Sequence, residues 1–195
     1  MNKALDILFG SPYRVKIIRL FLFNPNTYFT LTDIQKRSQV PARLVRREIK
    51  LLKDARFLRE KKIKEGSKSR KEWGMNDDFH LKGALMTLLE ADAALMKRSL
   101  FHRLKNVGRI KLIIVSGVFL GRNDSRADLL IVGDFLRTGK IETLLRKIEA
   151  DIGRELVYAL CETDEFGYRL SAYDKFIRDI LDYPHEKLVN KLNLP

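Results

Sequence analysis

The chain has 195 residues, of which 45% are hydrophobic and 32% are charged, a composition typical of a globular protein. No apolar run approaches the roughly 20 residues of a membrane-spanning helix, and the charged first ten residues do not resemble a secretory signal. A single cysteine, Cys161, excludes an internal disulfide framework, and the three histidines lack the spacing of a zinc site. We therefore expect a cytoplasmic protein with no cofactor and no membrane partner.

The net charge of +13 is concentrated in the first part of the chain. Residues 1–76 contain 19 Lys and Arg against 7 Asp and Glu, whereas residues 77–195 contain 19 against 18. A basic excess confined to one end of a chain indicates a polyanion-binding module followed by a nearly neutral one.

Three helices are predicted first in chain order. Ser11 followed by proline is a helix start, and the helix runs on through YRVKIIRLFLF to an Asn-Pro-Asn stop. Thr32 is expected to cap a second helix, DIQKRSQ. After a short turn, Pro41 starts a third helix, PARLVRREIKLLKDA.

The third helix has two different faces. Val45, Ile49 and Leu52 recur at i, i+4 and i+7 and predict a buried face. Four cations recur on the opposite face: Arg43, Arg46, Arg47 and Lys50. Two helices joined by a tight turn, the second of them basic, are typical of a helix-turn-helix whose recognition helix enters a major groove. The alternative is a basic helix face that is merely solvated.

The next segment, FLREKKIKEGSKSRKEWGMN, is predicted to be a β-hairpin with a polar tip. Its cations are candidate contacts to phosphates: Lys61, Lys62, Lys64, Lys68, Arg70 and Lys71. Trp73 is expected to pack the hairpin against the helices rather than to stack on a base.

Residues 11–76 resemble the winged helix-turn-helix of bacterial and archaeal transcription regulators. The likeness is carried by FTLTDIQKRSQVPARLVRREIKLLKDARFL and the basic hairpin that follows it. The resemblance implies double-stranded DNA as the partner, and it implies a DNA-binding domain over residues 1–78.

Residues 79–106 are predicted to be a helical connector, with Glu90-Ala91-Asp92 marking a break between two helical segments. Its leucines, which include Leu81 and Leu88, fit either a packed linker or a dimer interface. Operators for such modules are commonly two-fold, so we favour a homodimer.

Residues 107–195 are predicted to be a compact α/β module. Strands are expected over 109–115, 127–132 and 155–161, a helix over 140–152, then further helices and a closing strand over 187–192. The last helix is expected to bury a stripe that includes Tyr173 and Ile177.

The stretch SGVFLGRNDSRADLLIVGD resembles part of the minimal nucleotidyltransferase domain, in which a Gly-Ser turn and converging carboxylates hold two Mg²⁺ ions. Ser116 and Gly117 stand in reversed order in this chain. Asp128 matches the second carboxylate, Arg126 stands in place of the first, and residues 156–160 contain no acid for the third. The resemblance therefore implies a domain that has lost catalysis.

The degenerate pocket has two further interpretations. Asp128 can simply cap its strand or pair with Arg122 or Arg126. Alternatively, the pocket still binds an anion or Mg-nucleotide and makes the protein a nucleotide-sensing regulator, with five candidate residues: Ser116, Gly117, Arg122, Arg126 and Asp128.

The whole chain resembles small prokaryotic proteins in which a winged helix precedes an inactive nucleotidyltransferase-like domain, with endings similar to TDEFGYRLSAYDKFIRDILDYPHEKLVNKL. We predict an α+β protein with a winged helix-turn-helix (1–78), a helical connector (79–106) and a C-terminal nucleotidyltransferase-like α/β domain (107–195). Its expected function is that of a DNA-binding transcriptional regulator and not an enzyme. The alternatives are an active Mg-dependent nucleotidyltransferase of the antitoxin kind and an adaptor that binds RNA or protein.

Overall fold

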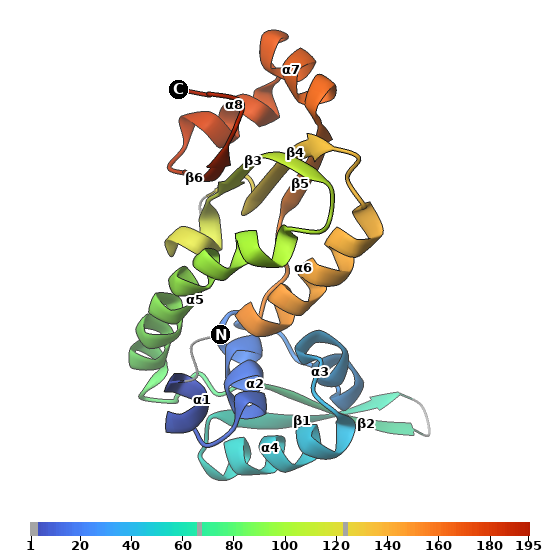
Figure 1. Ribbon diagram of the computed structural model, residues 1–195. Coiled ribbons are helices and arrows are strands. Elements are labelled where there is room, and N and C mark those ends of the chain that lie inside the picture. Colours follow the sequence, from blue (N-terminus) through green and yellow to red (C-terminus); the bar gives the residue numbers. More distant parts are fainter. Residues whose placement is uncertain (1–3, 66–67, 123–124) are drawn as a thin grey trace. The chain divides into compact units, whose positions relative to one another are not determined.

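A computed structural model of the chain has a mixed α+β fold (Figure 1). It describes residues 4–65, 68–122 and 125–195, and for residues 65, 68, 93–96, 98 and 99 it describes the backbone alone. The described residues group into two compact units. Residues 4–89 and 147–155 make up one, called here the N-terminal unit, and residues 90–146 and 156–195 make up the C-terminal unit.

The N-terminal unit begins with four helices: α1 (Ala4–Leu8), α2 (Pro12–Leu22), α3 (Leu31–Ser38) and α4 (Ala42–Asp54). The predicted start of α2 is confirmed, because the Ser11 hydroxyl accepts a hydrogen bond from the Arg14 amide and proline occupies the first helical position. The turn between α3 and α4 is also confirmed. Gln39 ends α3 in the left-handed conformation (φ 52°), and Pro41 directly precedes α4.

The prediction that Thr32 caps α3 was wrong. Thr30 is the capping residue: its hydroxyl accepts from the Asp33 amide at 3.2 Å, and the Asp33 carboxylate accepts from the Thr30 amide at 3.0 Å. This reciprocal pair satisfies two amides that the helix itself leaves without partners, so the helix begins before Thr32.

Strands β1 (Leu58–Glu65) and β2 (Lys68–Met75) form the predicted antiparallel hairpin. Phe29 adds a two-way backbone bridge to Trp73, with N···O distances of 2.8 and 2.9 Å. Trp73 is buried, as predicted, in a core that also holds Phe21, Ile34 and Leu52. The hairpin and the helices therefore share one hydrophobic core.

Helix α5 (Lys82–Leu104) is continuous, so the predicted break at 90–92 was wrong. Glu90-Ala91-Asp92 contains neither proline nor glycine, and all three residue types are compatible with a helix interior. Leu89 belongs to the core of the N-terminal unit, and Leu100 and Leu104 are buried in the C-terminal unit.

The C-terminal unit is built on a sheet in the order β5-β4-β3-β6. Its strands are β3 (Arg109–Val115), β4 (Leu129–Asp134), β5 (Tyr158–Glu162) and β6 (Glu186–Asn190). β3 pairs antiparallel with β4 and β6, whereas β4 and β5 are parallel and are connected through α6 (Thr138–Ile152). The predicted strands and helix are confirmed, with their ends shifted by up to three residues.

Helices α7 (Thr163–Ser171) and α8 (Lys175–Asp182) cover one face of this sheet (Figure 1). Phe166 and Ile177 from these helices pack there against Leu112, Leu130 and other strand residues. Cys161 is buried in the same cluster, and burial raises the pKa of its thiol. Tyr173 does not belong to the buried stripe. It is 76% exposed in the turn before α8, where it adopts a positive φ of 55°.

The end of α6 and the residues after it, 147–155, belong to the N-terminal unit. A division of the chain into continuous segments does not predict this arrangement. The buried Arg19 guanidinium donates to the Asp151 carbonyl at 2.5 Å, and the Asn24 side chain donates to the Gly153 carbonyl at 2.7 Å. A Cβ at position 153 would lie 2.5 Å from the backbone of Arg19, so glycine permits this close approach.

Among the described residues there is no helix of the length and apolar character needed to cross a membrane.

Candidate nucleic-acid interface

Helix α4 has one buried and one charged face. Val45, Ile49 and Leu52 are all at most 5% exposed and lie in the core with Ile34 of α3. The predicted recognition residues are exposed on the opposite side: Arg43, Arg46, Arg47 and Lys50. The helical period of 3.6 residues explains this separation, since i, i+3, i+4 and i+7 fall on one face.

The side chains of these four basic residues are exposed to solvent. In the described part of the chain, none of them forms an ion pair with a carboxylate. Arg43 and Arg47, and likewise Arg46 and Lys50, are like-charged neighbours four residues apart. Such pairs destabilise a helix by about 0.2–0.5 kcal/mol each. A bound polyanion would remove that repulsion.

Glu48 lies between these cations in sequence but turns to the buried face of α4. Its side chain is 4% exposed and accepts a hydrogen bond from Arg14 Nε at 2.8 Å. Arg14 also donates to the Phe9 carbonyl at 2.6 Å. Because Arg14 neutralises Glu48 inside the unit, Glu48 does not reduce the positive charge of the exposed face.

The N-terminus of α4 has no side-chain cap. Pro41 provides no side-chain cap, so the first amides of the helix have no side-chain acceptor there. A surface hollow of about 390 Å³ lies at this end, lined by Pro41, Arg43, Leu44 and Arg47. Two arginines beside a helix start are suited to a phosphate.

The basic residues of the hairpin fall on two different faces. Residues opposite each other in the β1–β2 register share a face, and the two faces alternate along each strand. Lys62 lies opposite Lys71, and Lys64 lies on the same face as this pair. Lys61 and Arg70 lie on the other face.

The two faces have different surroundings. Lys61 Nζ lies 5.5 Å from the centre of the Tyr28 ring, and Arg70 pairs with Glu72 at 2.7 Å. In contrast, Lys62 and Lys64 are exposed and have no carboxylate partner among the described residues. Lys68 begins β2, but its side chain lies outside the described part of the structure.

Two ion pairs made by Glu60 link α4 to the hairpin face that contains Lys62 and Lys64. Glu60 accepts from Lys53 of α4 at 2.5 Å and from Lys71 of β2 at 3.0 Å. Hydrogen bonds from Lys53 and Lys71 lower the pKa of Glu60 to about 2. The sequence pattern did not single out Lys53 and Glu60, because their separation of seven residues across a helix end is not a local signal.

The structure brings Ser116, Gly117 and Asp128 together in the C-terminal unit. The Ser116 hydroxyl donates to the Ala127 carbonyl, and the Gly117 amide donates to the Ser125 hydroxyl at 3.0 Å. Asp128 is buried, and its two oxygens accept from the Val118 amide at 2.9 Å and the Val157 amide at 3.0 Å. These hydrogen bonds join the turn after β3 to the segment before β5.

The arginines of the predicted anion pocket are placed differently. Arg126 pairs with Asp179 of α8 at 3.5 Å, and Arg122 is exposed in the loop that follows Gly121. Asp124, which lies near this loop in sequence, is outside the described residues. In the described ranges no three His, Cys, Asp or Glu side chains are grouped so that they could hold a metal ion.

No protein family, no curated protein and no solved structure matches this chain. The resemblances to winged helices and to nucleotidyltransferases therefore remain predictions.

Proposed function

We propose that the protein is a DNA-binding transcriptional regulator whose N-terminal unit acts as a winged helix-turn-helix. The observation that carries the proposal is the exposed face of α4, where Arg43, Arg46, Arg47 and Lys50 have no carboxylate partners among the described residues. The order of α3, a tight turn, α4 and a basic hairpin supports it.

In the proposed complex, α4 enters the major groove of duplex DNA. Its arginines contact guanine edges or phosphates, because the guanidinium fork matches both in a bidentate manner. Lys62, Lys64 and Lys71 contact the phosphate backbone, since they share the hairpin face that Glu60 links to α4. Phosphate contacts set position and affinity, and contacts to bases set sequence preference.

We propose that the C-terminal unit has no transferase activity. In the metal chemistry of nucleotidyltransferases a carboxylate must be available to a cation. Both oxygens of Asp128 are engaged by backbone amides, and Arg126 stands where the resemblance places another carboxylate. We expect no Mg²⁺-dependent transfer of labelled nucleotide to protein, RNA or DNA. Transfer that disappears in Asp128→Ala would overturn this part of the proposal.

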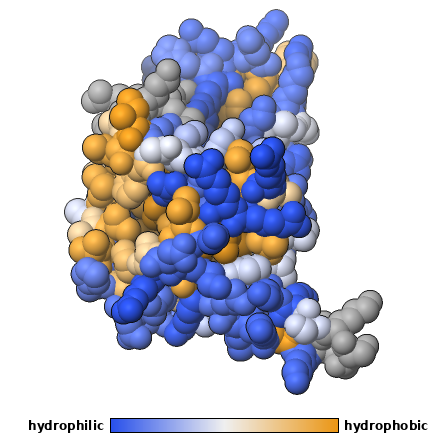
Figure 2. Space-filling model, turned by 90° about the horizontal axis from the view of Figure 1, so that it is seen from below, coloured by the Kyte–Doolittle hydropathy of each residue, from blue (hydrophilic) through white to orange (hydrophobic). Residues whose placement is uncertain are grey.

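We also propose that the protein forms a homodimer through an apolar area on α1, the turn before α5 and the first turns of α5. Ile7 and Leu8 are each 75% exposed, and Leu81 and Leu88 are 49% and 42% exposed. Figure 2 shows a hydrophobic area on one side of the face seen from below. Leu5 of α1 and Leu89 of α5 lie in one core cluster, and we propose that the exposed apolar residues of these two regions form one surface.

Fluorescence anisotropy with labelled duplex DNA tests the central proposal. Replacing Arg43, Arg46 and Arg47 together by alanine is expected to weaken binding by about a hundredfold or more, since each base-reading contact contributes about 1–3 kcal/mol. A matched control replaces the exposed Lys140, Lys175 and Lys191, which removes the same charge from the C-terminal unit.

Equal loss of binding in the control would mean a general charge effect and would contradict the proposed role of α4. Unchanged binding in the arginine variant would contradict it as well. A clear preference for RNA of the same sequence at matched salt would favour the adaptor function instead.

A further inference from the structure

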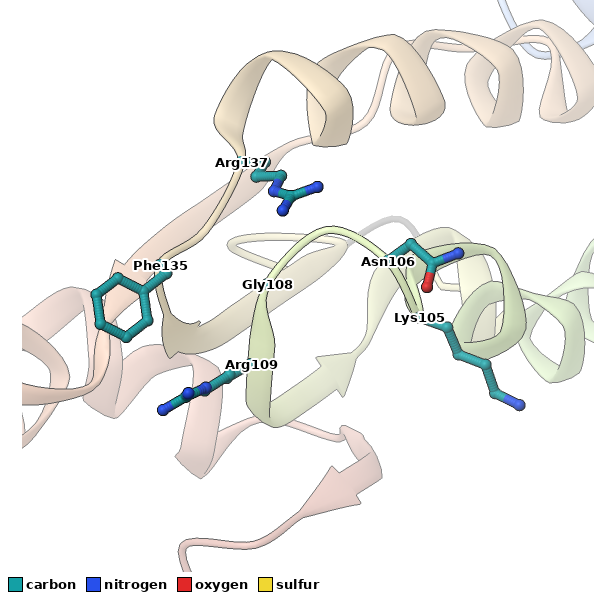
Figure 3. A pocket seen from close by; sticks show the side chains of 6 residues that line it. All are labelled: Lys105, Asn106, Gly108, Arg109, Phe135 and Arg137. Carbon is teal, nitrogen blue, oxygen red and sulfur yellow. The ribbon is translucent and has the colours of Figure 1, made fainter.

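A second basic hollow lies in the C-terminal unit, away from the pocket that the sequence pattern indicates. It has a volume of about 430 Å³ and is lined by Lys105, Asn106, Gly108, Arg109, Phe135 and Arg137 (Figure 3). In the β3–β4 register Arg109 lies opposite Asp134 at one end, whereas Val115 lies opposite Leu129 next to Ser116 at the other end. The hollow is therefore at the opposite end of this strand pair from Ser116 and Asp128.

The lining of the hollow carries three positive charges and no acid. Lys105, Arg109 and Arg137 are exposed, and none of them forms an ion pair with a carboxylate in the part of the chain that the structure describes. Two carboxylates near the hollow are already engaged by other groups. Asp134 accepts from the Thr163 hydroxyl and pairs with Lys111 at 3.3 Å, and it also interacts electrostatically with Arg109. Glu162 accepts from the backbone amides of residues 135 and 136.

Phe135 is held in a position that a hydrophobic core does not explain. The ring is 75% exposed, and the residue adopts the left-handed conformation with φ 55°. This conformation is unfavourable for a bulky side chain, and such residues cluster at ligand-binding sites. The guanidinium of Arg109 lies 5.5 Å from the ring centre.

Surrounding residues fix this turn. The Glu162 carboxylate accepts from the Phe135 amide at 3.2 Å and the Leu136 amide at 3.3 Å. Gly108, at φ 144°, passes so close that a Cβ there would lie 2.9 Å from the Phe135 carbonyl oxygen. The fold therefore holds an aromatic ring outward beside the Arg109 guanidinium.

We propose that this hollow binds a nucleoside phosphate. Arg109 and Arg137 would hold phosphate oxygens, and the exposed side of the Phe135 ring would stack on the base. Figure 3 shows Phe135 and Arg109 on one side of the Gly108 segment, Arg137 above this segment, and Lys105 on its other side, pointing away from Phe135. A volume of about 430 Å³ is adequate for such a ligand.

The same chemistry is present in a free nucleotide and in a single strand of nucleic acid. ATP and a fluorescein-labelled oligothymidylate strand are therefore tested in parallel. Both are titrated against the full chain that carries the Arg43, Arg46 and Arg47 alanine substitutions, so that the basic face of α4 does not contribute. Calorimetry measures ATP, and anisotropy measures the strand.

Three variants in this background separate the possible causes. Arg109→Ala with Arg137→Ala removes two cations of the hollow and is expected to weaken binding at least tenfold. Phe135→Gly removes the ring and relieves the positive φ. It is expected to weaken binding about fivefold or more without loss of thermal stability. Lys175→Ala with Lys191→Ala removes the same charge elsewhere in the unit and is expected to change binding less than about twofold.

Binding of ATP alone would identify a free nucleotide as the ligand, and binding of the strand alone would identify a nucleic-acid strand. Competition between the two would place both in the hollow. The proposal is overturned if neither probe binds at millimolar concentration. It is equally overturned if the Lys175 and Lys191 control loses as much affinity as the Arg109 and Arg137 variant. Each of these results is independent of duplex binding by α4.

Discussion

Asp128 occupies the space that a side chain at position 117 would need. A Cβ atom at this position would lie 2.1 Å from Asp128 Oδ1, and Gly117 itself has a positive φ of 53°. The carboxylate that comes this close accepts the amides of Val118 and Val157. Glycine at position 117 is thus required by contact and by backbone conformation together.

Gly117→Ala is expected to lower the free energy of unfolding by about 2–4 kcal/mol, the combined cost of overpacking and of a left-handed alanine. Urea denaturation measures this. Gly167→Ala is the control, because Gly167 lies within α7 and a Cβ there would meet no atom within 4 Å. It is expected to raise stability by about 0.5–1 kcal/mol. Equal effects from the two substitutions would contradict the role given to Asp128.

Arg14→Ala is expected to destabilise the N-terminal unit by about 2–3 kcal/mol, because it leaves the Glu48 carboxylate buried without its cation. Arg59→Ala breaks an exposed pair with Asp77 and is expected to cost less than about 1 kcal/mol. Replacing Arg14 and Glu48 together by methionine is expected to recover most of the loss. Chemical denaturation compares the three variants, and a double variant no more stable than Arg14→Ala would contradict the explanation.

Because of Glu60, the stability of the protein is expected to decrease as the pH falls through the acidic range. Its pKa is about 2 in the folded protein, against an ordinary value of 4.5, because Lys53 and Lys71 donate hydrogen bonds to its charged form. A lowered pKa contributes its full stabilisation at any pH above the pKa of the group in the unfolded chain. This contribution is lost as the pH falls through the pKa of the group in the folded protein. The relevant window is therefore pH 4.5 to 2.

Glu60→Gln is accordingly expected to be less stable than the unsubstituted chain above about pH 5 and to lose less stability as the pH falls to about 2. Thermal melts of both proteins across this range measure the difference, and all other carboxylates are common to both. Parallel pH profiles would show that the two lysines do not stabilise the charged form of Glu60.

The division of the hairpin into two faces predicts different salt dependences. Lys62→Ala and Lys64→Ala are each expected to weaken binding to all duplex sequences equally. Each should also reduce the slope of log affinity against log salt by about one unit. Lys61→Ala is expected to leave the slope unchanged, since Lys61 lies on the opposite face over Tyr28. A similar loss of slope in all three variants would contradict the assignment of faces.

The proposed dimer predicts that charge on the apolar area prevents self-association. Ile7→Glu and Leu88→Glu are expected to yield monomers in size-exclusion chromatography with light scattering, because a buried unpaired carboxylate is costly. Tyr168→Glu, at a position 74% exposed on α7, is the control and is expected to leave the mass unchanged. A monomeric unsubstituted chain at micromolar concentration would refute the dimer.

Prediction from the sequence succeeded where the signal is local. Ser11 and Pro41 mark helix starts because capping and the fixed φ of proline act within one turn. The prediction that Thr32 caps α3 failed even at this range, because Thr30 stands two residues earlier and is the same type of capping residue. The reciprocal bond between Thr30 and Asp33 decides between them.

Local sequence patterns do not predict the position of a side chain whose partner lies far along the chain. Phe135 reads as an ordinary apolar residue after a strand, and its outward position depends on Glu162 and Gly108. Arg19 lies within an apolar helix, and its burial depends on the carbonyl of Asp151, 132 residues later. No periodicity contains this information.

The sequence by itself determined most of the elements of this protein and the concentration of positive charge in its first 76 residues, since propensity, capping and side-chain period are properties of short segments. Only the tertiary structure decided which charges stay in solvent. It turned Glu48 inward onto Arg14, and it paired Glu60 of the hairpin with Lys53 of α4 and Lys71 of β2. The reason is that charge pairing depends on distances between elements, and packing of the core sets those distances.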